Sequence, residues 1–260
     1  MFIRTERSVR DFISFYPVVS TIIIINLILW MLIYIFPFAI GDIIYYFGVG
    51  HNFSVLHGEY WRLITPIFLH GGFSHVAFNS FSLVLFGPAL EQMLGKPKFI
   101  VAYFLTGIAG NLGTFIINPT SFTPHLGASG AIYGLFGIYL FMVFFRKHLI
   151  DAANASIVQV IFVIGLVMTF IQPNINIAAH IFGFIGGFAI GPVMLKNVQP
   201  FSMERNYARR RATFHDGDIQ FDPNRWNKRR LIPPKLRKYL FWFIFGGLVL
   251  LGIISSYFTR

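Results

Sequence analysis

Five long stretches of this chain contain no Asp, Glu, Lys or Arg, and they limit what it can fold into. They cover residues 12–41, 63–90, 99–145, 152–195 and 239–259, with lengths of 30, 28, 47, 44 and 21 residues. A helix that crosses the hydrocarbon core of a bilayer needs about 20 apolar residues. Three stretches can therefore hold one span each. The two longest, which carry proline-containing turns near their middles, can hold two.

These lengths predict seven membrane spans and an all-α membrane protein, a polytopic helical bundle. The predicted spans are residues 17–38, 74–93, 98–117, 128–146, 154–171, 178–195 and 238–258. The composition agrees, because 55% of the residues are hydrophobic and only 12% are charged, against about 25% charged in an average globular domain. So few charges exclude a soluble enzyme and a disordered chain.

Lysine and arginine outnumber aspartate and glutamate by 21 to 10, which gives a net charge of +11. In a soluble protein this excess would suggest nucleic acid binding. Here 19 of the 21 basic residues fall on the same side of the predicted bundle as the N-terminus. The positive-inside rule therefore predicts a cytoplasmic N-terminus and an outer C-terminus. The expected partners of these charges are anionic lipid headgroups on the cytoplasmic side, and no nucleic acid.

The spans predict four parts along the chain. These are a cytoplasmic N-terminal tail (1–16), a six-helix core (17–195), a basic cytoplasmic connection (196–237) and a seventh transmembrane helix (238–260). Within the core, residues 39–73 form a long outer connection rich in Tyr, Phe and Trp. Aromatic side chains favour the membrane interface, so this connection is predicted to hold short amphipathic elements there.

Several polar residues of the core are predicted to share one depth in the membrane. His75 and Asn79 lie at the start of the second span, Ser129 starts the fourth, and His180 starts the sixth. In the predicted topology all three spans begin at the outer surface and run inward. A rise of 1.5 Å per residue then places these side chains within about 10 Å of that surface.

Each of these residues also has a structural interpretation. Ser129 lies among glycines, and Gly130…Gly134 and Gly183…Gly187 fit the small-xxx-small pattern of helix contacts. A histidine at a helix end can be an interface anchor, an asparagine can bond a neighbouring helix, and Arg62 can extend to the interface. His70 and His75 are five residues apart without a carboxylate, which is a weak zinc signal. We therefore expect no metal and no cofactor.

Taken together, the residues suit nucleophilic catalysis. A serine hydroxyl needs a base, and an imidazole supplies one near neutral pH. The N–H groups of a helix N-terminus can stabilise an oxyanion, and Gly127 and Gly130 allow close backbone approach. The side chains of His75 and Asn79 can add donors. The chain has no cysteine, and the only carboxylate within these spans is Glu91, at the inner end of the second. The expected machinery is therefore a dyad of Ser129 and His180, with Tyr133 packed on the imidazole.

Four motifs occur in a characteristic order. They are Trp61-Arg62, His75…Asn79 preceded by His70, Gly127-Ala128-Ser129-Gly130 followed by Tyr133, and His180…Gly183…Gly187. In these motifs the chain resembles the rhomboid family of intramembrane serine proteases, over roughly residues 17–195. The resemblance implies a rhomboid-like six-helix core with Ser129 as nucleophile and His180 as general base. It also implies an oxyanion site formed by His75, Asn79 and the Ser129 backbone N–H.

The resemblance implies an endopeptidase that cleaves single-span membrane proteins near the outer face of a bacterial cytoplasmic membrane. The predicted seventh helix resembles the family variant with one extra C-terminal span. Two other functions stay open. An inactive rhomboid-like protein would bind client transmembrane helices without needing both Ser129 and His180. A channel or proton-coupled transporter could use the histidines as relays, although the spans offer it no carboxylate apart from Glu91 at the inner end of the second span.

Overall fold

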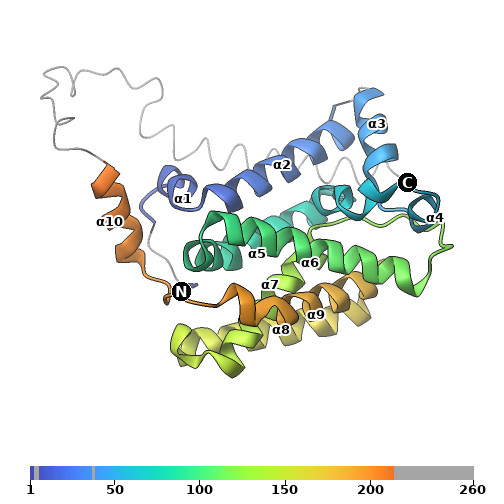
Figure 1. Ribbon diagram of the computed structural model, residues 1–260. Helices are drawn as coiled ribbons and strands as arrows, with labels where there is room; N and C mark the ends of the chain where they lie inside the picture. The colour runs from blue at the N-terminus through green and yellow to red at the C-terminus, as the bar shows by residue number, and fades with distance from the viewer. Residues whose placement is uncertain (3–5, 37–38, 214–260) are drawn as a thin grey trace, which may run out of the picture. The chain divides into compact units, whose positions relative to one another are not determined.

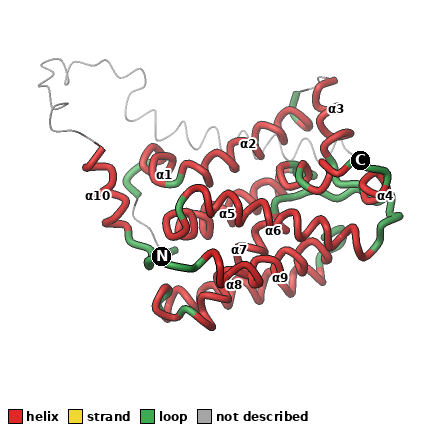
Figure 2. The backbone as a smooth tube through the Cα atoms, viewed as in Figure 1, coloured by secondary structure: helices red, strands yellow, loops and turns green. Residues whose placement is uncertain are grey.

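The computed structural model describes residues 1–2, 6–36 and 39–213, and the regular elements of this part of the chain are helices (Figures 1 and 2). This confirms the predicted all-α polytopic bundle. The chain divides into two compact units, residues 1–202 and residues 203–260. The described part of the second unit is the single helix α10 (Met203–Thr213).

Six helices of the first unit correspond to the six predicted spans of the core. They are α2 (Pro17–Tyr34), α5 (Phe73–Leu94), α6 (Lys96–Ile117), α7 (Ser129–Phe145), α8 (Ala152–Ile171) and α9 (Ile177–Met194). Five are long and apolar enough to cross a membrane, whereas α7 is apolar but has 17 residues. The predicted seventh span, residues 238–258, lies outside the described residues.

Helix α7 forms the centre of the first unit. It packs against α5, α6, α8 and α9, and every residue from Gly130 to Leu140 is buried. Helix α8 is peripheral, since only 11% of the residues in its hydrophobic stretch are buried. A central helix enclosed by others explains why the shortest span is hydrophobic on all sides.

The closest helix contact joins α7 to α9 through glycines. A Cβ atom on Gly183 would overlap the carbonyl oxygen of Gly130, and one on Gly187 would overlap that of Gly134. The small-xxx-small interpretation of these glycines therefore applies. This contact matters for the site because it brings the first turns of α7 and α9 together.

The first residues of the chain pack against the bundle instead of forming only a tail. The Phe2 ring contacts Phe86 and Tyr139 edge-on, and its backbone N–H donates to Asn154 Oδ1. A short helix, α1 (Val9–Phe15), follows, and the Ser8 side chain caps it. The predicted tail 1–16 thus contains an element that hydropathy alone does not indicate.

Glu91, near the end of α5, caps the start of α2. Its two carboxylate oxygens accept hydrogen bonds from the backbone N–H groups of Val18 and Val19, at 3.0 and 2.8 Å. The side chain is 3% exposed. A carboxylate at a helix N-terminus satisfies otherwise unpaired N–H groups and interacts favourably with the helix dipole.

We expect Glu91→Ala to lower the free energy of unfolding by about 1.5–3 kcal/mol, because two buried N–H groups lose a charged acceptor. The control is Glu91→Gln, which keeps the side-chain length and one acceptor oxygen and should lose less. Unfolding in mixed SDS and dodecylmaltoside micelles measures both. Equal stability of Glu91→Ala and wild type would contradict this assignment.

The connection 39–73 folds into short helices, as predicted, namely α3 (Ala39–Gly48), α4 (Asn52–Leu56), η1 (Tyr60–Leu63) and η2 (Thr65–Phe68). α5 and α9 both begin at the end of the first unit where α3 and α4 lie (Figure 1). The connection therefore lies at the end of the bundle where the polar residues of the predicted site gather.

Candidate active site

Ser129 and His180 lie within hydrogen-bond distance, 51 residues apart in the sequence. Nε2 of His180 is 2.8 Å from Oγ of Ser129. Ser129 is the first residue of α7, and His180 lies in the first turn of α9. His180 is 6% exposed, whereas Ser129 is half-buried. Ser129 is thus the more accessible member of the pair.

The Tyr133 ring stacks on the imidazole of His180. The ring centroids are 4.1 Å apart and the planes differ by 14°. Tyr133 lies one turn after Ser129 on α7, so a single helix supplies both the Ser129 hydroxyl and the ring that stacks on His180. This arrangement matches the ring packing expected from the sequence.

The His75 ring and the Ser129 hydroxyl both lie beside Gly127. Gly127 has a φ of +132°, and a Cβ atom there would lie 2.7 Å from Nε2 of His75 and 3.6 Å from Oγ of Ser129. The backbone N–H of Gly71 donates to Nδ1 of His75 at 3.3 Å. In a neutral imidazole the proton then sits on Nε2. His75 therefore presents a donor toward the space beside the serine.

Asn79 lies one helical turn after His75 on α5. Its Nδ2 donates to the His75 carbonyl at 3.0 Å, and the residue is 6% exposed. An amide nitrogen carries two hydrogens, so a second donor remains. Figure 1 places the start of α5 at the same end of the bundle as the start of α9.

His70 supports the turn that leads into α7. Its Nε2 accepts a hydrogen bond from the Ala128 N–H at 3.5 Å, and its ring meets that of His75 edge-on at 5.0 Å. Burial, with a smaller effect of the neighbouring His75, lowers the pKa of His70 to about 3. His70 is therefore a neutral acceptor near pH 7. This turn is also held by the Gly127 N–H, which donates to the Pro66 carbonyl at 2.9 Å.

The start of α7 offers further donors. No side chain caps this helix, and the N–H groups of a first helical turn have no partner within their own helix. The N–H of Ser129 is one of them. Together with the donors of α5, the site can stabilise negative charge beside the serine oxygen.

Trp61 and Arg62 bond the backbone of the 39–73 connection. Arg62 is 4% exposed; Nη1 donates to the carbonyls of Tyr46 and Val49 at 2.9 and 2.7 Å, and Nε pairs with Glu59. Arg62 therefore caps the end of α3, and the interpretation as a residue that extends to the interface is wrong. The reason is that free carbonyls at a helix C-terminus attract a guanidinium.

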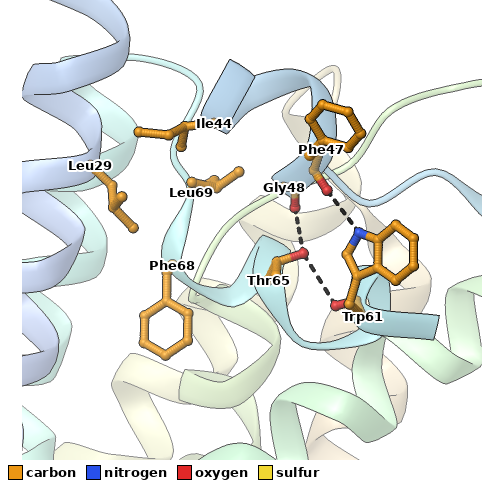
Figure 3. A pocket seen from close by; sticks show the side chains of 8 residues that line it. All are labelled: Leu29, Ile44, Phe47, Gly48, Trp61, Thr65, Phe68 and Leu69. Atoms are coloured by element: carbon orange, nitrogen blue, oxygen red, sulfur yellow. Dashed lines mark hydrogen bonds between the residues drawn. The ribbon is translucent and has the colours of Figure 1, made fainter. Parts of the chain in front are cut away.

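An apolar cavity of about 320 Å³ lies between α2 and this connection (Figure 3). The Trp61 indole N–H donates to the Phe47 carbonyl beside it, and the Thr65 hydroxyl contacts the carbonyls of Gly48 and Trp61. The lining residues are Leu29, Ile44, Phe47, Gly48, Trp61, Thr65, Phe68 and Leu69. The cavity therefore lies beside the connection, and neither Ser129 nor His180 lines it.

Sequence reasoning missed Thr169 of α8. Its hydroxyl lies 2.8 Å from Nδ1 of His180 and 2.7 Å from the Tyr133 hydroxyl. The available signal was topological: the last turn of the fifth span lies at the same membrane depth as the first turns of the fourth and sixth. A hydroxyl there is a candidate partner for His180.

Within the described residues, no group of three or more His, Cys, Asp or Glu side chains could hold a metal ion. Both His70 and His75 use one ring nitrogen to accept a backbone N–H.

The sequence is similar to those of rhomboid proteins. A family model described as Rhomboid domain matches residues 57–197. "Putative rhomboid protease YdcA" of Bacillus subtilis (strain 168) is 47% identical over 192 residues, which cover 73% of this chain and 94% of that protein. Rhomboid protease GluP of the same organism is 39% identical over 142 residues, 55% of this chain and 27% of GluP. Rhomboid-like protease 1 of Toxoplasma gondii is 31% identical over 165 residues, 61% of this chain and 55% of that protein.

Proposed function

This chain belongs to the rhomboid family, and we propose that it is an intramembrane serine endopeptidase that works with a dyad of Ser129 and His180. Relatives named as rhomboid proteases support an intramembrane protease function. The observation that carries the proposal of a Ser129–His180 dyad is the 2.8 Å distance between Oγ of Ser129 and Nε2 of His180. A nucleophile and its base must lie within this range for proton transfer.

In the first step Oγ of Ser129 attacks the carbonyl carbon of the scissile peptide bond. Nε2 of His180 takes the hydroxyl proton, and the carbonyl oxygen becomes an oxyanion. The backbone N–H of Ser129, Nε2–H of His75 and Nδ2–H of Asn79 are the donors proposed to stabilise it. These donors come from the first turn of α7 and from α5, so the site is organised before substrate binds.

In the second half of the reaction the imidazolium of His180 gives its proton to the leaving amine, and the C–N bond breaks. An acyl-enzyme on Ser129 remains. His180 then takes a proton from water as the water attacks the ester carbonyl, and it returns that proton to Oγ as the ester breaks. Serine and histidine are both regenerated.

The proposed substrates are single-span membrane proteins, cut near the outer face. Rhomboid proteases act on transmembrane substrates, and Ser129 and His180 lie in the first turns of two apolar helices of 17 and 18 residues. A peptide bond inside a helix is shielded by its own hydrogen bonds. Helix-destabilising residues in the upper part of the substrate span, with a small residue before the cut, should therefore favour cleavage.

The proposed orientation places the dyad end of the bundle outside and both the N-terminus and the opposite end in the cytoplasm. Basic residues support it: Lys96 and Lys98 begin α6, Arg146 and Lys147 follow α7, and Lys196 follows α9. All five lie at the end of the bundle opposite the dyad. There they would face the anionic headgroups of a bacterial cytoplasmic membrane.

A serine-directed fluorophosphonate probe tests this function against the alternative of an inactive helix-binding protein. We expect the probe to add to purified wild-type protein at Ser129, as mapped by peptide mass spectrometry, because the base makes this hydroxyl nucleophilic. Ser129→Ala protein of the same thermal stability is the matched control and should stay unlabelled. A folded wild-type protein that the probe leaves unmodified would favour the helix-binding alternative.

A further inference from the structure

Thr169 lies in the last turn of α8 and is 1% exposed. Its Oγ1 is within hydrogen-bond distance of three groups. These are the Gly165 carbonyl at 2.9 Å, the Tyr133 hydroxyl at 2.7 Å and Nδ1 of His180 at 2.8 Å. A hydroxyl has one proton and two acceptor positions, so three partners use its full capacity.

The position of the protons follows from what each partner can do. A carbonyl oxygen only accepts, so the single proton of Thr169 points to Gly165. Oγ1 must then accept from both remaining partners, the Tyr133 O–H and the Nδ1–H of His180. In a neutral imidazole a proton on Nδ1 leaves Nε2 unprotonated. That nitrogen is the one 2.8 Å from Oγ of Ser129.

The opposite arrangement would disable the base. If Thr169 donated to Nδ1 of His180, the neutral ring would carry its proton on Nε2 and could not accept one from Ser129. The Gly165 carbonyl would also lose its side-chain donor. The three distances together therefore favour the tautomer that catalysis needs.

Tyr133 reinforces the same arrangement from a second direction. Its ring stacks on His180, and its hydroxyl donates to the oxygen that receives the imidazole proton. The ring thus fixes the plane of the imidazole. The hydroxyl occupies the second acceptor position of Thr169 Oγ1. Thr169 comes from α8 and Tyr133 from α7, so two helices position a base that belongs to a third.

We propose that Thr169 is a positioning residue for the base: its hydroxyl accepts the Nδ1–H of His180 and so directs the unprotonated Nε2 toward Ser129. This role rests on the proposed protease function. Thr169 is a neutral counterpart of the carboxylate that orients histidine in a three-residue serine protease site. It does not contact the substrate, so its effect should fall on the chemical step and not on binding.

The experiment compares Thr169→Val with Thr169→Ser, using cleavage of a fluorogenic single-span peptide in proteoliposomes. Valine keeps the shape of threonine and removes the hydroxyl, whereas serine keeps the hydroxyl. We expect Thr169→Val to lower kcat by about 10–100-fold with KM unchanged, because a buried N–H loses its acceptor and the useful tautomer loses its preference. Thr169→Ser should keep nearly all of the wild-type kcat. The rate of fluorophosphonate labelling at Ser129 should fall with kcat in the valine variant.

Two results would overturn the proposal: a Thr169→Val enzyme with wild-type kcat, or valine and serine variants that lose kcat equally. Thermal unfolding checks each variant, and Thr169→Ala replaces the valine variant if that one does not fold. Ser129→Ala and His180→Ala serve as references. If Ser129→Ala and His180→Ala are active, the proposed function is refuted. If both are inactive and Thr169→Val is fully active, only the role of Thr169 is refuted.

Discussion

Ser129→Ala should lower the rate of cleavage of a single-span membrane substrate by about 10⁴–10⁶-fold, since removing the nucleophile of a soluble serine protease lowers kcat by about 10⁶-fold. The substitution deletes one oxygen atom, 2.8 Å from the His180 nitrogen. Water cannot replace it efficiently, because the first turns of α7 and α9 hold nucleophile and base in one geometry. Rates of product formation in proteoliposomes measure the effect.

The control for Ser129→Ala is a comparison of its unfolding midpoint with that of the wild type. Ser129 is half-buried and its side-chain hydroxyl does not cap α7, so the unfolding midpoint should stay close to that of wild type. The variant should also still bind the substrate. A stable variant that cleaves within tenfold of wild type would contradict the role of Ser129 as nucleophile.

His180→Ala should cause a loss of similar size, about 10⁴–10⁶-fold in kcat, because the nucleophile then has no base. Residues that act as one unit are strongly non-additive. The double variant Ser129→Ala/His180→Ala should therefore be no slower than either single variant. Kinetics of the three variants under one set of conditions test this.

The informative control for His180 is Tyr133→Phe. Phenylalanine keeps a ring that can stack on the imidazole and removes the hydroxyl that reaches Thr169. We expect Tyr133→Phe to retain much more activity than His180→Ala. Losses in the single variants that multiply in the double variant would show that Ser129 and His180 act separately, which would contradict the dyad.

Much of the fold is predictable from the sequence because a bilayer leaves few choices. Uncharged stretches must form helices that satisfy their own backbone, and the six described spans begin and end within a few residues of their predicted bounds. The same topology brings Ser129 and His180 together, since spans that run in the same direction start at the same depth. No local pattern is needed for this inference.

Other features depend on side-chain partners that sequence periodicity does not encode. Glu91 caps a helix that begins more than 70 residues earlier, and Phe2 packs on residues of α5 and α7. Arg62 caps α3 from within a connection that has no regular period. Thr169 was missed because a lone threonine in an apolar helix usually bonds its own backbone, as this one also does with Gly165. Its second role appears only when three helices are placed together.

The most direct test of the account is mass spectrometry of membrane-protein fragments from cells that express the wild type or Ser129→Ala at equal levels. The account predicts fragments of single-span proteins that end inside the outer part of the membrane segment. They should be present with the wild type and absent with the variant. The same fragments from both cultures, or no such fragments from cells with folded wild-type protein and a suitable single-span substrate, would contradict an intramembrane protease that works through Ser129.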